Sequence, residues 1–171
     1  MGDMGKGSGM KRLLLGAGMI AALTNMSGAA AAPAKPVPYW ASIQSGEAMM
    51  RSGPARTYPG MWLYKRRDLP VEIEREFEVW RLVRDQENVK GWVHQATLIG
   101  RRTIIVTGGE RVLRREAKDG AAVVAQLKPG VIARLRSCEA GSDWCQVQKE
   151  EYRGWMKRAE FWGVYPGEAV Q

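Results

Sequence analysis

The chain has very few of the side chains that most catalytic and metal sites require. Among 171 residues there is one histidine, His94, and there are two cysteines, Cys138 and Cys145. A zinc site needs four ligands, and two cysteines with one histidine cannot complete it within one chain. A serine or cysteine nucleophile would need a base, and His94 would be the one histidine for that role. We interpret His94 as a polar residue at a strand end, and we expect no catalytic residue, metal or cofactor.

Paired carboxylates for glycosidase chemistry are also hard to find. Glu72, Glu74, Glu76 and Glu78 are spaced by two residues. Side chains at that spacing lie on one face of a β-strand, so the pattern indicates a solvated strand face. An enzyme of unrecognised type remains only the third alternative for this chain.

Long helical periodicity is scarce, and the pattern that stands out has a period of two. Leu69, Val71 and Ile73 alternate with other residues, and residues 131–135 show the same alternation. Such alternation indicates half-buried strands separated by tight turns. An antiparallel barrel lets a small unit of about five short strands bury one face without leaving open edges.

The chain repeats itself at a fixed offset. Residues 90–98 (KGWVHQATL) match residues 153–161 (RGWMKRAEF), and the positions differ by 153 − 90 = 63. Residues 50–51 match 113–114 at the same offset, and an earlier tryptophan precedes each Gly-Trp pair. Self-similarity at a fixed period indicates a duplicated structural unit.

The N-terminus has the features of a targeting segment. Lys6, Lys11 and Arg12 precede an apolar stretch, and small residues follow at 27–32. This pattern predicts a signal peptide over residues 1–31, followed by a proline-rich lead-in over 32–40. The alternative is that the segment is retained as a transmembrane anchor. We expect a periplasmic or secreted protein without stable membrane insertion after signal removal.

The charge of the chain is positive. Its 26 basic and 18 acidic side chains give +8, and removal of residues 1–31 takes away three basic and one acidic side chain, leaving +6. Outside the cytoplasm, this charge favours an anionic envelope polymer over nucleic acid as a partner. Simple solubility explains the charge equally well.

Cys138 and Cys145 form an even pair in a chain that is predicted to be exported. The turn-like residues between them would bring two adjacent strands together, so we predict a structural disulfide. A loop this short stabilises a domain by about 2.5 kcal/mol in the chain-entropy model. A redox pair or half of a metal site are the alternatives.

Several motifs resemble those of bacterial SH3-like domains. Residues 47–60 (EAMMRSGPARTYPG) resemble their opening, and Trp80 followed by the Gly-Trp-Val of residues 91–93 resembles their ending. Residues 64–71 and 162–168 narrow the resemblance to exported two-domain SH3-like proteins of alphaproteobacterial type. It implies an all-β fold of two tandem small SH3-like barrels after the signal peptide.

The domain limits that follow are 41–107 for the first barrel and 108–168 for the second. The strand at 103–107 is expected either to end the first barrel or to be shared at the junction. Gly108 and Gly109 mark the boundary.

Aromatic residues of the first copy are the better candidates for binding. Tryptophan and tyrosine combine a large apolar area with a polar group, which suits peptide or sugar contacts. The second copy has Ala121, Ala125 and Leu127 where the first has aromatic side chains, so we place binding on the first barrel. Trp92 recurs as Trp155 and is interpreted as structural, whereas Trp80 is expected to be partly exposed. The predicted ligand-binding residues are Tyr58, Trp62, Tyr64, Trp80 and Arg51.

The resemblance implies a non-catalytic binding module of the cell envelope that recognises peptidoglycan or its peptide stems. The alternative is a periplasmic protein–protein adaptor, which would use the aromatic surface of the first barrel or the edge of the strand at 103–107. The expected partner is therefore peptidoglycan or a cell-envelope protein, and not nucleic acid.

Overall fold

The computed structural model describes residues 35–171, so the signal peptide predicted over residues 1–31 lies outside the described residues. The described chain is all-β, with fourteen strands in two antiparallel sheets and two short 3-10 turns. The prediction of an all-β fold in two tandem units is therefore confirmed. Within the described part, no helix is long and apolar enough to cross a membrane.

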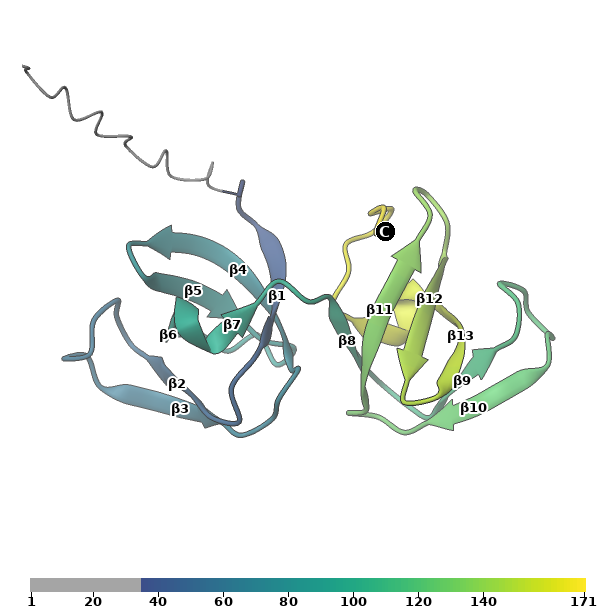
Figure 1. Ribbon diagram of the computed structural model, residues 1–171, viewed down its shortest axis with the longest axis horizontal. Coiled ribbons are helices and arrows are strands. Elements are labelled where there is room, and N and C mark those ends of the chain that lie inside the picture. The colour runs from purple at the N-terminus through teal and green to yellow at the C-terminus, as the bar shows by residue number, and fades with distance from the viewer. Residues whose placement is uncertain (1–34) are drawn as a thin grey trace, which may run out of the picture. The chain divides into compact units, whose positions relative to one another are not determined.

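The first sheet contains seven strands in the order β3-β2-β6-β5-β4-β1-β7 (Figure 1). The sequence predicts about five, and the two additional strands include a two-residue strand that follows the turn η1 (Gln95–Thr97). The strands are β1 (Tyr39–Ile43), β2 (Ala48–Arg51), β3 (Gly60–Tyr64), β4 (Pro70–Phe77), β5 (Trp80–Arg84), β6 (Lys90–His94) and β7 (Leu98–Ile99).

The second sheet repeats this order strand for strand, as β10-β9-β13-β12-β11-β8-β14 (Figure 1). The repeat seen in the sequence is therefore a repeat of the whole topology, including the turn η2 (Arg158–Glu160). The strands are β8 (Thr103–Val106), β9 (Arg111–Arg114), β10 (Val123–Leu127), β11 (Ile132–Cys138), β12 (Trp144–Lys149), β13 (Tyr152–Lys157) and β14 (Phe161–Trp162).

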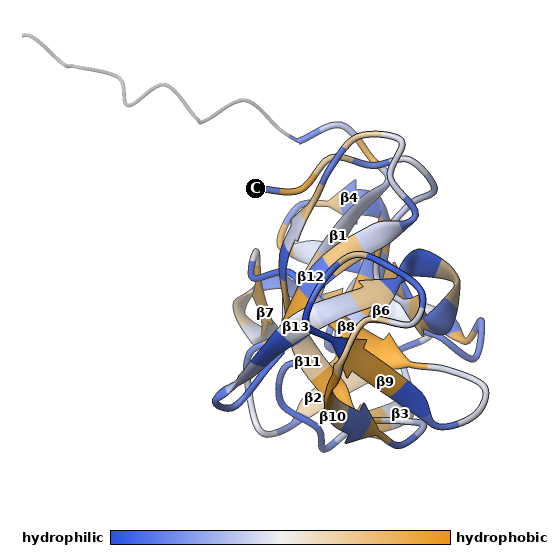
Figure 2. Cartoon of the chain, turned by 90° about the vertical axis from the view of Figure 1, so that its right-hand side faces the viewer, coloured by the Kyte–Doolittle hydropathy of each residue, from blue (hydrophilic) through white to orange (hydrophobic). Residues whose placement is uncertain are grey.

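Each sheet encloses its own apolar core. Along the strands, hydrophobic and hydrophilic residues follow each other closely (Figure 2), and most of the buried hydrophobic residues of each sheet gather in one cluster. Full burial of one such aliphatic side chain contributes about 1.5–3 kcal/mol. Fully buried residues of the first core include Ile43, Met50, Val71, Ile73, Val83 and Val93, and those of the second include Ile104, Leu113, Val147 and Met156.

The glycine of each Gly-Trp pair allows two strands to approach closely. A Cβ atom at Gly91 would lie 2.4 Å from Met50 Cγ, and one at Gly154 would lie 2.7 Å from the carbonyl oxygen of Arg114. Both separations are far shorter than a van der Waals contact. Only glycine fits where β6 and β13 face the neighbouring strand, which explains the repeated Gly-Trp.

Strand β8 belongs to the second sheet, where it pairs with β11 and β14. The sequence instead suggests that this segment ends the first domain or is shared at the junction. Its hydrogen bonds are those of the second domain, but Ile105 is fully buried in the first core. The strand is therefore shared in its packing and not in its pairing.

Further contacts join the two domains within the compact unit Ala34–Gln171. The hydroxyl groups of Ser42 and Thr103 lie 2.6 Å apart, and Thr103 Oγ1 donates to the carbonyl oxygen of Asp68. The rings of Trp40 and Trp162 pack edge to face, with centroids 4.5 Å apart. Such pairs contribute about 0.5–1.5 kcal/mol beyond their buried area.

Cys138 and Cys145 form the predicted disulfide, which joins β11 to β12. The two residues are directly opposite each other in the antiparallel ladder. The prediction of a disulfide at this hairpin is therefore confirmed.

Candidate functional site

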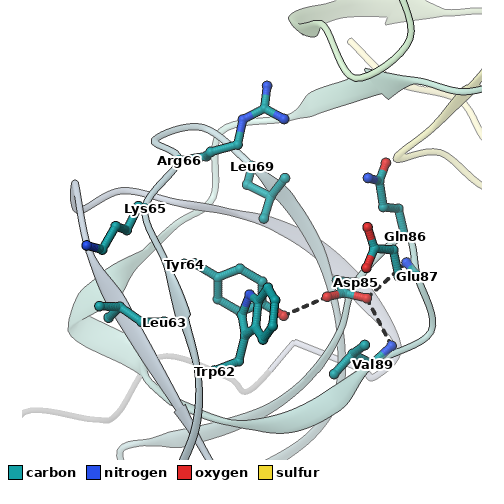
Figure 3. Close-up of a pocket in the computed structure, with 10 residues that line it drawn as sticks. All are labelled: Trp62, Leu63, Tyr64, Lys65, Arg66, Leu69, Asp85, Gln86, Glu87 and Val89. Carbon is teal, nitrogen blue, oxygen red and sulfur yellow. Dashed lines mark hydrogen bonds between the residues drawn. The ribbon is translucent and has the colours of Figure 1, made fainter.

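A pocket of about 260 Å³ opens on the first domain (Figure 3). Two segments form it: strand β3 with the residues after it, and the turn that joins β5 to β6. Apolar side chains and side chains of both charges line it together. The lining residues are Trp62, Leu63, Tyr64, Lys65, Arg66, Leu69, Asp85, Gln86, Glu87 and Val89.

Asp85 holds the two walls of this pocket together. Its Oδ2 accepts a 2.9 Å hydrogen bond from the hydroxyl of Tyr64 on β3. Its Oδ1 accepts hydrogen bonds of 2.9 Å from the backbone N–H groups of both Glu87 and Val89. The carboxylate is buried, and these three donors satisfy it. The turn and the strand are thus fixed relative to each other.

Tyr64 is a structural member of the pocket wall. Its side chain is buried, and its ring forms part of the lining. Burial and the hydrogen bond to the Asp85 carboxylate both raise the pKa of Tyr64 above its ordinary value. The phenol therefore remains protonated and continues to donate to Asp85.

Trp62 is the most accessible aromatic side chain of the pocket. It is 57% exposed, although its indole is apolar over most of its area. Trp62 and Tyr64 are two residues apart on β3, and both line the pocket together with Asp85 (Figure 3). An exposed indole at the rim of a formed pocket can stack on a ligand without reorganising the domain.

Arg51 is occupied by a contact within the protein. Its Nη1 donates to the carbonyl oxygen of Tyr58 at 2.8 Å, and Arg114 donates to the carbonyl oxygen of Ala121 at 3.0 Å in the second domain. The same contact at the same offset of 63 residues indicates that this arginine holds the loop after β2, or after β9, in both domains.

Tyr58 lies outside the set of residues that line the pocket, although it is 46% exposed. A Cβ atom at Gly53 would be 2.5 Å from its ring, so the ring rests against the backbone of its own loop. The structure thus brings together Trp62 and Tyr64 from the predicted set, but not Tyr58 or Arg51.

Trp80 is buried, with only 7% of its surface exposed, so the expectation that it is partly exposed is wrong. Its ring packs edge to face against the imidazole of His94. His94 Nδ1 accepts a hydrogen bond from the backbone N–H of Ala96 and caps η1. In the second domain Lys157 and Trp144 occupy the matching positions and form a cation–π contact, with Nζ 5.3 Å from the ring centroid. Both pairs are structural.

The interpretation of the glutamates of β4 as a solvated face is also wrong. Glu72 is buried and pairs with Arg84 of β5. Glu74 lies 3.2 Å from Arg84 Nε and 2.8 Å from Lys90 Nζ. The spacing by two does place these carboxylates on one face, but neighbouring strands supply cations that cover them.

The second domain lacks the groups that make the pocket. At the positions of Trp62, Tyr64 and Asp85, counted along the matched strands, it has Ala125, Leu127 and Lys149. None of these can form the tyrosine–aspartate link. The loss of the aromatic residues is evident from the sequence, but the role of Asp85 is not, because aspartate is common at the start of turns of every kind. Its only signal is the position directly after an apolar strand.

Two solved structures of other proteins resemble the chain weakly. They are those of NlpC1 and NlpC2 from Trichomonas vaginalis, each with 10% sequence identity and with TM-scores of 0.35 and 0.33. The matches cover 76% and 75% of this chain, but only 47% and 49% of those chains, so this chain spans about half their length. No curated protein matches the chain.

The family model described as bacterial SH3 domain matches the chain twice, over residues 44–100 and 107–163. Each match covers all of one sheet except its first strand, β1 or β8, and includes the Gly-Trp strand of that sheet. The chain therefore belongs to the bacterial SH3 domain family.

Proposed function

We propose that the pocket of the first domain binds peptide stems of peptidoglycan and that the protein is a non-catalytic module of the cell envelope. The observation that carries this proposal is the exposed indole of Trp62 beside a pocket that Asp85 holds open. Bacterial SH3 domains are commonly modules that bind the cell wall, which supports the same function.

The chemistry of the pocket fits a short peptide. Leu63 and Val89 offer apolar contact, and Trp62 offers a flat face. Glu87 and Lys65 carry opposite charges at the exposed rim. A peptide stem with both free amino and carboxylate groups could pair with both side chains, whereas a neutral glycan could use only the apolar wall.

An extracytoplasmic location is part of this proposal. The disulfide between Cys138 and Cys145 fits an oxidising compartment, and so does the family. The predicted signal peptide would deliver the chain to the periplasm or to the medium. Residues 32–171 would then be the mature protein.

The test is co-sedimentation of residues 32–171 with purified peptidoglycan sacculi. These residues contain the whole compact unit. The variant is Trp62→Ala, and the matched control is Phe77→Ala, because Phe77 is also about half exposed but does not line the pocket. We expect a loss of about tenfold in affinity for Trp62→Ala and none for Phe77→Ala.

Failure of the folded, oxidised wild-type protein to sediment with sacculi at low salt would contradict the proposal. The second candidate is then an adaptor that binds a periplasmic protein through the same pocket. It is favoured by the size of the exposed indole, since tryptophan is enriched at the centres of protein interfaces. Binding of a single protein that Trp62→Ala abolishes would identify it.

A further inference from the structure

The two domains differ sharply in charge at equivalent positions of their sheets. In the first domain, Glu72 and Glu74 of β4 face the cations Arg84 and Lys90 on the next two strands. The four side chains carry two negative and two positive charges and balance each other. The face is neutral, and its charges are paired within the protein.

In the second domain the matching positions carry no carboxylate. Glu72 is opposite Arg84 in the first sheet, and Arg134 is opposite Gln148 at the matching place in the second. The register therefore aligns Glu72 with Arg134, and Arg84 with Gln148. Glu74 and Arg136 are both the extra residue of a β-bulge at the same point of the strand. Lys90 aligns with Arg153, because Lys90 is opposite Arg84 and Arg153 is opposite Gln148. The four positions therefore carry three positive charges.

We call Arg134, Arg136 and Arg153 the arginine face. The three side chains line one shallow pocket of about 450 Å³. Gln146 of the intervening strand also lines it, and Gln148 lies between Arg134 and Arg153 in the register. Within residues 35–171, none of the three arginines forms an ion pair.

Two further arginines line the same pocket but are already paired. Arg101 contacts Asp68 at 2.9 Å, and Arg102 contacts Glu168 at 2.6 Å. Arg101 and Arg102 are thus each committed to a carboxylate of the protein. The arginine face keeps its charge, and Arg134 and Arg153 are exposed to solvent.

The spacing of the arginine face suits a ligand with several anionic groups. Arg134 and Arg153 lie on strands separated by one other strand, so their backbones are about 10 Å apart. Arg134 and Arg136 are two residues apart on one strand, a rise of about 7 Å. Planar guanidinium groups at these separations can each bind one carboxylate in a bidentate manner.

We propose that the arginine face is a second binding surface, which takes a carboxylate-bearing polymer. Carboxylate is favoured over phosphate because the duplicate of this face in the first domain already binds carboxylates at this geometry, through Arg84 and Lys90. In the second domain an external polymer supplies the anions that Glu72 and Glu74 supply in the first. This proposal does not depend on the pocket at Trp62.

The probe is a labelled poly-glutamate oligomer, titrated with residues 32–171 at low salt while fluorescence anisotropy is followed. The variant Arg134→Gln/Arg136→Gln/Arg153→Gln should weaken binding by about tenfold or more, because three charge-assisted contacts are lost. Added salt should weaken binding of the wild type and have less effect on the variant. Thermal unfolding of each protein confirms that it is folded.

The matched control removes three exposed cations elsewhere, as Arg75→Gln/Arg115→Gln/Lys118→Gln. It has the same net charge as the first variant, and we expect it to bind nearly as tightly as the wild type. An equal loss in both variants would show that only net charge matters and would overturn the proposal. No binding by the wild type would overturn it as well.

Further measurements distinguish this proposal from binding at the Trp62 pocket and from binding of a phosphate polymer. Arg136→Glu places a carboxylate where the first domain has Glu74, and we expect it to pair with Arg153 and to abolish poly-glutamate binding. Trp62→Ala should leave poly-glutamate binding unchanged, so failure of the peptidoglycan proposal would not affect this result. Tighter arginine-dependent binding of polyphosphate than of poly-glutamate would assign the face to a phosphate polymer and would sink the carboxylate proposal.

Discussion

The two domains close the same hairpin with different chemistry. In the first domain the cross-strand pair is Glu76 and Arg81, whose charged groups lie 3.0 Å apart and are mostly shielded from solvent. In the second domain the same pair of positions holds Cys138 and Cys145. An ion pair depends on pH and salt, whereas a disulfide depends on an oxidising compartment. The same cross-strand position thus stabilises the hairpin in both domains, but the type of interaction differs.

The same comparison extends to the two candidate surfaces. The first domain has an aromatic pocket and a charge-balanced sheet face, whereas the second has Ala125 and Leu127 at the positions of the pocket's aromatic residues and an arginine face. Both domains keep the glycine at the strand crossing and the arginine that holds the loop. Duplication preserved the contacts that build the barrel, and the surfaces diverged around them.

The largest expected effect is that of removing the disulfide. Cys138→Ser/Cys145→Ser should lower the free energy of unfolding of the second domain by about 2.5 kcal/mol, because a short loop is no longer closed in the unfolded chain. Urea unfolding followed by tryptophan fluorescence measures the change. Reduction of the wild type should give the same shift, and an unchanged midpoint would show that the bond contributes nothing.

The second effect concerns the glycine at each strand crossing. Gly154→Ala should destabilise the protein by about 2 kcal/mol, because the new Cβ meets the backbone oxygen of Arg114, which cannot rotate away. Gly91→Ala should cost less, since the atom nearest to its Cβ belongs to the Met50 side chain. Urea midpoints of the two variants test the order, and a larger loss for Gly91→Ala would contradict it.

A smaller effect is expected at the pocket. Tyr64→Phe removes the donor to Asp85 and should cost about 1 kcal/mol of stability, because a buried acceptor loses one of its three partners. The matched change Leu127→Ala in the second domain would instead report cavity formation. The pocket variant should also bind sacculi more weakly than the wild type. If stability falls while binding is unchanged, Tyr64 does not shape the site.

The smallest effect is a dependence on pH that arises near the C-terminus. Burial alone would raise the pKa of Glu168, but hydrogen bonds from Arg102 and from the backbone N–H of Tyr165 lower it below its ordinary value. The carboxylate therefore stabilises the native state at neutral pH, and its contribution is lost as the pH falls from the ordinary glutamate pKa through the lowered one. Glu168→Gln should flatten the fall in melting temperature over this range, and an unchanged profile would contradict the assignment.

Much of the fold could be predicted from the sequence because its determinants are local. The period of two at Leu69, Val71 and Ile73 marks a strand wherever that strand lies, and the Gly-Trp repeat marks two copies of one unit. The two-residue strands β7 and β14 are too short to show any period. The place of β8 could not be predicted either, since its pairing with β11 depends on contacts across the sheet.

The candidate site was predictable only in part. Trp62 stands out because the second copy lacks it, and the structure places it at a pocket. Trp80 has the same residue type and a similar setting in the sequence, yet it is buried against His94. Asp85 and the cations that cover Glu72 come from other strands, so their roles depend on register. Register depends on turn geometry and on the hydrophobic pattern of both strands, and here bulges shift it, so no single position reveals it.

Ile105 has a consequence for how this protein can be divided. Its backbone is hydrogen-bonded in the second sheet, whereas its side chain fills part of the first core. A cut between residues 100 and 103 would leave the first core with a hole and the second domain with an exposed isoleucine. The pair of domains, and not the single domain, is therefore the unit that can be transplanted, shuffled or inherited intact.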